Sequence, residues 1–181
     1  MAGADSPKLP SGLAIEVLGP VHVDGFYRLR LSSLEQSPHS FGTHAETLQQ
    51  ASQEQILAQL KTSASDPGQF ILGAFAAAEL VGMLGFKREP KLNVAHKATL
   101  WGFFVEPEYR HRGIGTALVA AAMHRAAALE GLHHVRLVLT SCDHAARHVF
   151  ASQGFEQFGL EAAGIRLDGL DYDQVFMLRK L

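Results

Sequence analysis

Apolar and polar positions along this chain follow two rhythms, which together predict one mixed α/β domain. Short apolar or β-branched runs bounded by Gly, Pro or polar residues are typical of strands. Apolar positions three and four residues apart are typical of amphipathic helices. We expect strands at residues 13–18, 70–75, 80–86, 96–105, 135–140, 155–158 and 175–178.

The remaining segments predict helices and their connections. Helical spacing occurs at residues 26–34, 46–62, 116–129 and 144–153. Gly131 and Gly154 are placed to end the last two helices, and Asp143 can cap the start of the fourth. Connections are expected as a disordered leader at residues 1–12, loops at 37–43 and 87–93, and a long turn-rich link at 159–174.

Residues 100–129 have the order of a strand, a Gly-rich loop and a helix. Glu106 and Pro107 end the strand, because proline cannot donate to the ladder. Gly113 and Gly115 then precede an Ala-rich helix. The first turn of a helix has N–H groups without intrahelical partners, and the helix dipole adds partial positive charge there.

This loop also carries cationic side chains, Arg110 and Arg112. Glycines without Cβ atoms let a phosphate approach the backbone closely. The stretch therefore predicts a pyrophosphate site, and the alternative is a Gly-rich helix start that binds nothing.

Two familiar phosphate motifs do not fit the loop. A Walker loop requires a Gly-Lys pair, which the chain lacks, and a dinucleotide fingerprint requires glycine where the chain has Leu118. The loop instead resembles motif A of the GNAT acyltransferase superfamily, Arg/Gln-x-x-Gly-x-Gly/Ala, through Arg110, Gly113 and Gly115. The resemblance implies acetyl-CoA as the acyl donor.

A second stretch resembles the later motif of the same family, Asn-x-x-Ala-x-x-Leu-Tyr-x-x-x-Gly-Phe. Its counterparts in this chain are Asp143, Ala146, Val149, Phe150, Gly154 and Phe155. The order of the predicted elements is also similar to the GNAT fold over nearly the whole chain. That fold is a mixed, mostly antiparallel sheet, splayed between its fourth and fifth strands and flanked by about four helices.

The resemblance implies which residues contact the acyl donor. Backbone groups of Phe103, Phe104 and Val105 would pair with pantetheine, and an N–H of Phe104 or Val105 would stabilise the oxyanion. Plain core packing is the alternative for the two phenylalanines. Asp143 and Phe150 would also contact the donor. The pyrophosphate loop would consist of Arg110, His111, Arg112, Gly113, Ile114, Gly115 and Thr116.

The acceptor is expected to be a primary amine, which attacks only when neutral. Deprotonating it near neutral pH costs about 4 kcal/mol. Family members often carry an acidic residue on the fourth strand, where this chain has Thr99. We take His96 as the substitute general base, because imidazole titrates near neutrality, with Glu79 and Asp173 as further candidates. A solvated or structural histidine is the alternative for His96.

The departing CoA thiolate must be protonated, and the family uses a Tyr of the second motif where this chain has Phe150. Tyr172, Cys142, a water molecule or the amine's own proton could fill that role. Cys142 is otherwise expected to be a small buried apolar residue.

Several histidines could suggest a metal site. His144 and His148 lie one helical turn apart, a spacing that can bind a metal, but no third ligand accompanies them. We therefore expect no metal. His133 and His134 are expected in a solvated turn.

Composition narrows the classes of function. A chain of 181 residues, 47% hydrophobic, suits one domain at residues 13–181, and a net charge of −2 with scattered basic residues argues against nucleic-acid binding. The most membrane-like run, residues 70–86, contains Glu79 and three glycines and fits two strands better. The single cysteine and the absence of a signal peptide suit the cytoplasm.

Together these observations predict a cytoplasmic N-acetyltransferase that transfers an acetyl group from acetyl-CoA to a primary amine by direct attack in a ternary complex. The acceptor is a small molecule or a peptide, and a homodimer is one assembly to consider. Neither nucleic acid nor a membrane is expected as a partner. A noncatalytic acyl-CoA sensor or interaction module is the alternative, because the family's Tyr is missing and its usual acidic base is not evident.

Overall fold

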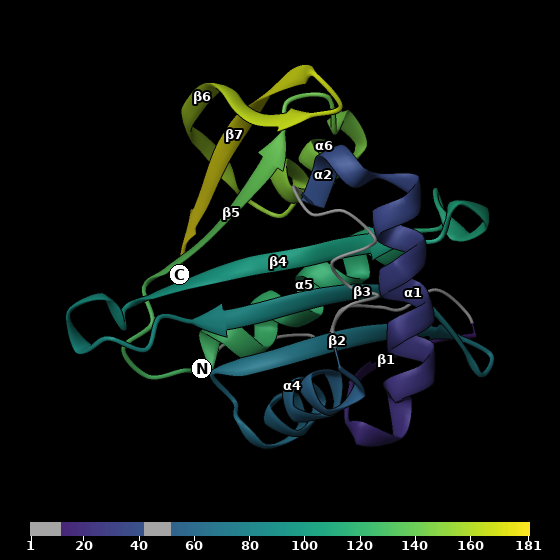
Figure 1. The fold of residues 1–181 in the computed structure, drawn as a ribbon. Coiled ribbons are helices and arrows are strands. Elements are labelled where there is room, and N and C mark those ends of the chain that lie inside the picture. Colours follow the sequence, from purple (N-terminus) through teal and green to yellow (C-terminus); the bar gives the residue numbers. More distant parts are fainter. Residues whose placement is uncertain (1–11, 42–51) are drawn as a thin grey trace.

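The computed structural model describes residues 12–41 and 52–181. Seven strands form one sheet in the order β1-β2-β3-β4-β5-β7-β6 (Figure 1). Neighbouring strands are antiparallel except β4 and β5, which are parallel, so the predicted mixed sheet is confirmed. The strands are β1 (Leu13–Val17), β2 (Gln69–Ala76), β3 (Glu79–Arg88), β4 (Lys97–Val105), β5 (His134–Thr140), β6 (Glu156–Leu167) and β7 (Leu170–Lys180).

Helices cover both faces of this sheet. The α-helices of the described residues are α1 (Val23–Gln36), α2 (Pro38–Phe41), α4 (Gln53–Ser65), α5 (Ile114–Ala127) and α6 (His144–Ser152). Short 3-10 helices occur at Pro20–His22, Leu92–Val94 and Pro107–Tyr109. The helices α1 and α4 lie on one face and α5 on the other (Figure 1). Among the described residues, no helix is both long and apolar enough to span a membrane.

Each face of the sheet has its own apolar core, as the two-sided burial of the central strands requires. Leu29 of α1, Leu60 of α4 and Phe104 of β4 belong to one core. Leu118 of α5 and Phe150 of α6 belong to the other. Leu100 of β4 also belongs to this second core, so β4 contributes side chains to both layers.

The strands β4 and β5 pair only at one end. Parallel pairing joins Lys97, Ala98 and Thr99 to the first three residues of β5. Beyond Thr99, β4 stays paired with β3, while β5 stays paired with β7, and the two strands separate (Figure 1). The predicted splay between the fourth and fifth strands is confirmed.

The turn-rich link predicted for residues 159–174 is wrong, because these residues extend β6 and β7 into a long hairpin. Asp168 and Gly169 form its two-residue turn, with φ of 50° and 77°, as a tight hairpin turn requires. Register shifts interrupt the pairing after Gln157 and after Glu161. Most side chains of β6 are exposed, so the alternation that marks a half-buried strand is missing from its sequence.

Two helix starts also differ from the prediction. Pro38 begins α2 inside the predicted loop, because proline suits the first position of a helix. Helix α4 begins at Gln53, since the Ser52 hydroxyl accepts the N–H of Gln55 at 3.2 Å and the Gln55 side chain accepts the N–H of Ser52 at 3.0 Å. The predicted residues 46–51, like residues 1–11 of the predicted leader, lie outside the described residues.

The predicted caps are confirmed in part. Gly154 follows α6 with a φ of 80°. Gly131 has a φ of 70° but lies beyond the C-cap Ala128, so it belongs to the next turn rather than to the helix end. Asp143 occupies the N-cap position of α6, yet its carboxylate makes no cap hydrogen bond. That carboxylate is engaged elsewhere, as described below.

Candidate active site

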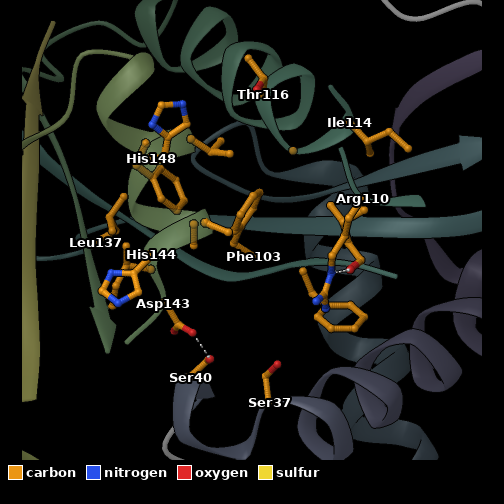
Figure 2. A pocket seen from close by; sticks show the side chains of 18 of the residues that line it. Ser37, Ser40, Phe103, Arg110, Ile114, Thr116, Leu137, Asp143, His144 and His148 are labelled. Atoms are coloured by element: carbon orange, nitrogen blue, oxygen red, sulfur yellow. Dashed lines mark hydrogen bonds between the residues drawn. The ribbon is translucent and has the colours of Figure 1, made fainter. Parts of the chain in front are cut away.

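A cavity of ≈ 790 Å³ opens where β4 and β5 separate (Figure 2). Residues 100–105 of β4 and 137–139 of β5 line two of its sides, and the loop before α5 and the start of α6 line others. Ser37 and Ser40 reach it from the end of α1 and from α2. The cavity therefore joins the predicted donor strand to the predicted phosphate loop.

The backbone of β4 presents an open edge to this cavity. The Glu106 N–H donates to the Val81 carbonyl on β3 at 2.9 Å. Because backbone groups alternate sides along a strand, the N–H of Val105 faces away from β3 and that of Phe104 faces towards it. Of the two expected oxyanion donors, only Val105 has its N–H on the open side, and the expectation for Phe104 is corrected.

A bulge in β4 lies within this wall. Gly102 has a φ of 65°, and the register with β3 shifts between Met83 and Gly85. Glycine adopts this backbone at little cost, and bulges commonly bend strands beside binding sites. The bulge directly precedes Phe103, whose ring packs edge-on against Phe150 with centroids 5.0 Å apart.

The loop before α5 has the backbone geometry expected of an anion site. Gly113 adopts a left-handed φ of 77°, and α5 begins at the next residue. The Ala117 N–H is the first to bond within the helix, to the Gly113 carbonyl at 3.0 Å. The N–H groups of Ile114, Gly115 and Thr116 are thus left for a ligand.

The two arginines of the loop contact different parts of the structure. The Arg110 Nε donates to the Val105 carbonyl at 2.9 Å, and its guanidinium carbon lies 5.6 Å from the centre of the Phe104 ring. Arg110 therefore ties the loop to the end of β4. Arg112 packs 5.2 Å from the Tyr109 ring and lines a second hollow rather than the cavity. His111, with a φ of 60°, does line the cavity.

The structure does not bring His96 to the cavity. It precedes β4 at the end that pairs with β5, where its ring lies 5.8 Å from that of His134. Leu100, the first cavity residue of the strand, is four residues further on, about 13 Å along a strand. Partial desolvation, with the nearby charge of Lys97, lowers the pKa of His96. His134 begins β5 instead of lying in a turn.

The other expected bases, Glu79 and Asp173, also lie outside the cavity lining. The Glu79 carboxylate accepts from the Tyr109 hydroxyl at 3.1 Å, and this hydrogen bond raises the pKa of Tyr109. The Asp173 carboxylate accepts from the Ala163 N–H at 2.9 Å. Both carboxylates therefore stabilise the local structure around them by accepting these hydrogen bonds.

Thr99 and Tyr172 are likewise absent from the cavity lining. The Thr99 hydroxyl donates to Glu89 at 3.3 Å and accepts from Arg136 at 3.2 Å. The Tyr172 ring stacks on that of His39, with centroids 5.5 Å apart. Residue 99 lies outside the cavity lining, so having Thr there instead of an acidic residue takes no group away from the cavity.

Asp143 lies in the cavity wall (Figure 2), and two hydroxyls donate to its carboxylate. Its Oδ1 accepts from the Ser40 hydroxyl at 2.9 Å, and its Oδ2 accepts from the buried Thr140 hydroxyl at 2.7 Å. The His39 Nε2 lies 3.5 Å from Oδ1. No sequence signal marks His39 or Ser40, since their contact with Asp143 spans about a hundred residues of chain.

Four further side chains, at residue 142 and within the second motif, line the cavity. Cys142 is exposed rather than buried as expected, and partial desolvation together with the charge of Asp143 raises the pKa of its thiol. His144 and His148 lie on the cavity side of α6 (Figure 2). Phe150 is only 1% exposed and backs the wall behind Phe103.

The chain matches the Acetyltransferase (GNAT) family over residues 27–155. It is similar in fold to the GNAT-family acetyltransferase from Streptococcus pneumoniae, at 22% identity and a TM-score of 0.85 over 93% of this chain and 99% of that chain. The ribosomal-protein-alanine N-acetyltransferase from Brucella melitensis gives 22% identity, a TM-score of 0.79 and coverages of 93% and 99%.

The yncA protein from Salmonella typhimurium, solved with its cofactor acetyl-CoA, is 16% identical, with a TM-score of 0.79 over 94% of this chain and 95% of that chain. No curated protein matches the sequence significantly. The family match covers most of the chain and includes β4, the phosphate loop and α6. This protein therefore belongs to the Acetyltransferase (GNAT) family.

Proposed function

We propose that this chain transfers an acetyl group from acetyl-CoA to a primary amine by direct attack in a ternary complex. One observation carries the proposal: the open edge of β4 at Val105 and the free N–H groups at the start of α5 line the same cavity. Membership of the family and the acetyl-CoA complex of the yncA protein support it.

The donor would lie along the open edge of β4. Its pyrophosphate would accept from the N–H groups of residues 114–116, where the helix dipole favours negative charge. Its pantetheine arm would pass beside Phe103, with Phe150 behind the wall. The thioester carbonyl would then accept from the Val105 N–H, which stabilises the negative charge that develops on oxygen.

In the proposed reaction, none of the residues that we expected as general bases would deprotonate the amine. The neutral amine attacks the thioester carbon and forms a tetrahedral intermediate whose oxyanion accepts from Val105. The carbon–sulfur bond then breaks, and the amine nitrogen loses one proton while the CoA thiolate gains one. His96, Glu79 and Asp173 lie outside the cavity lining, so free neutral amine would be the reacting species.

A noncatalytic acyl-CoA sensor is the second candidate. The observation in its favour is Phe150, which stands where the family has a Tyr and offers no proton. A sensor would bind acetyl-CoA but would not speed the release of its thiol when amines are added.

Replacing Val105 with proline tests the oxyanion role directly. Val105→Pro removes an N–H that faces the cavity and leaves the ladder to β3 intact, because proline is tolerated where the N–H points out of the ladder. We expect the turnover number to fall about 10²–10³-fold, with acetyl-CoA still bound. Val105→Ala, which keeps the N–H, is the matched control. Equal turnover of the two variants would contradict the assignment.

A further inference from the structure

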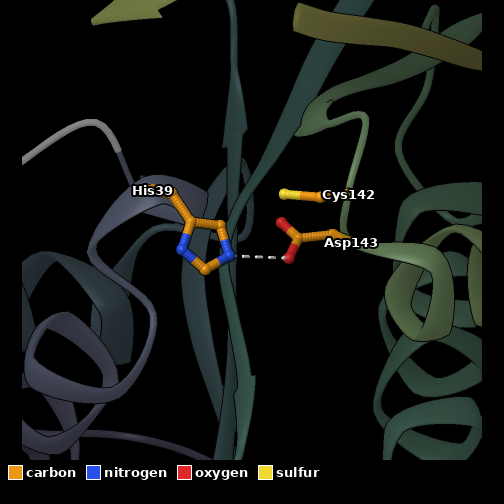
Figure 3. Close-up of side chains that lie close together, drawn as sticks. All are labelled: His39, Cys142 and Asp143. Atoms are coloured by element: carbon orange, nitrogen blue, oxygen red, sulfur yellow. Dashed lines mark ion pairs between the residues drawn. The ribbon is translucent and has the colours of Figure 1, made fainter. Parts of the chain in front are cut away.

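Three side chains beside the cavity have the atoms that zinc prefers as ligands (Figure 3). His39 comes from α2, and Cys142 and Asp143 come from the corner between β5 and α6. An imidazole nitrogen, the thiol sulfur and a carboxylate oxygen all lie within 4.8 Å of one another. We propose that these three residues form a site for a divalent ion of the zinc class, Zn²⁺ itself being the expected occupant.

The spacing of the three atoms is close to that of a zinc site. The His39 Nε2 and the Asp143 Oδ1 are 3.5 Å apart, which exceeds the usual hydrogen-bond length. Two nitrogen or oxygen ligands of one tetrahedral zinc ion lie about 3.3 Å apart, and sulfur lies about 3.6 Å from either. All three atoms lie within 4.8 Å of one another, so the Cys142 sulfur must approach the other two by about 1.2 Å at most.

Neighbouring residues already orient two of the three ligands. The Thr140 hydroxyl, 2% exposed, donates to the Asp143 Oδ2 and directs Oδ1 towards His39. The Tyr172 ring stacks on the His39 imidazole at an interplanar angle of 17°. Such outer contacts fix the orientation of metal ligands and are a regular part of metal sites.

The charges also balance. A Cys142 thiolate and an Asp143 carboxylate together neutralise a divalent cation, while His39 binds as neutral imidazole. The thiol proton leaves to the solvent when the ion binds. Three protein ligands leave the fourth tetrahedral position open to water or another small donor.

A bound ion would join two distant parts of the chain across the cavity. Cys142 and Asp143 line the cavity directly, and His39 precedes Ser40, which also lines it. The ion would therefore tie α2 to the start of α6. This inference does not depend on acetyl transfer, because it concerns ligand atoms that no proposed step of that reaction uses.

Cobalt titration of the tag-free full chain tests the site. The chain has one cysteine, so a near-ultraviolet sulfur-to-cobalt charge-transfer band can arise only from Cys142. We expect such a band to saturate at one Co²⁺ per chain, independently of protein concentration, and to disappear when Zn²⁺ is added. Cys142→Ser should lose the band, and Thr140→Val should weaken cobalt affinity by about 10–100-fold.

The histidines of the chain supply the matched control. His39→Gln should weaken cobalt affinity at least as much as Thr140→Val, whereas His148→Gln, on α6, should bind cobalt as the wild type does. Circular dichroism checks that each variant is folded. The proposal is overturned if no charge-transfer band forms, if His39→Gln titrates like the wild type, or if the band requires two chains per cobalt ion.

Discussion

The Phe103 ring presses on Gly115 so closely that a Cβ atom at residue 115 would lie 2.8 Å from its Cζ. This contact joins β4, whose open edge faces the cavity, to the first turn of α5. Packing against Phe103 is thus enough to explain glycine at this position, apart from the phosphate approach that we propose. The spacing between strand edge and helix start depends on this pair.

Gly115→Ala should separate that strand edge from the helix start. We expect overpacking to cost about 1–3 kcal/mol of unfolding free energy and acetyl-CoA affinity to fall with it. Chemical denaturation and calorimetry measure the two effects. Phe103→Leu added to Gly115→Ala should restore much of both, because it removes the clashing atoms. A double variant no better than Gly115→Ala would show that the clash is not the cause.

Local patterns were enough to predict the central strands and the Gly-rich loop before α5. Strand β4 and helix α5 are buried on the faces that their apolar spacing indicates, and Gly113 adopts the left-handed backbone that a Gly-rich helix start suggests. The hairpin of β6 and β7 was missed because its largely exposed side chains carry no alternation.

The rest of the site depends on contacts between distant parts of the chain. Ser40 and Asp143 are 103 residues apart in sequence, and no local pattern marks such a contact. The prediction of His96 as the base depends on its place at the start of the strand that lines the cavity, which is β4. Which end of β4 faces the cavity is decided by the point where β5 separates from it, and sequence periodicity does not contain that information.

Gly113→Asp should weaken acetyl-CoA binding while the fold survives. The new carboxylate would stand at the N-terminus of α5, where we propose that the pyrophosphate binds, and like charges repel. Gly113→Asn is the control, because Asn tolerates the left-handed backbone and carries no charge. We expect Gly113→Asp to bind at least about tenfold more weakly than Gly113→Asn by calorimetry, about 1.4 kcal/mol. Equal affinities would remove the phosphate role of this loop.

The pH profile of turnover distinguishes free amine attack from base catalysis by His96. At saturating acetyl-CoA, the rate should climb with pH towards the pKa of the amine, because only the neutral amine attacks. The pKa of His96 is lowered, so a rate limb due to His96 would lie below about 6.5, the ordinary value of histidine. His96→Gln should therefore leave the profile unchanged. Loss of an acid limb in His96→Gln would reinstate this residue as the base.

Release of free thiol from acetyl-CoA, measured with and without amines, tests the proposed acetyl transfer most directly. The panel should contain small amines, polyamines, amino acids and peptides with free N-termini, with Gly113→Asp as the control for binding. We predict that at least one amine speeds thiol release by the wild-type chain and yields an N-acetylated product detectable by mass. If acetyl-CoA binds by calorimetry and none of these amines speeds thiol release, the chain is an acyl-CoA-binding module and the proposed transfer is contradicted.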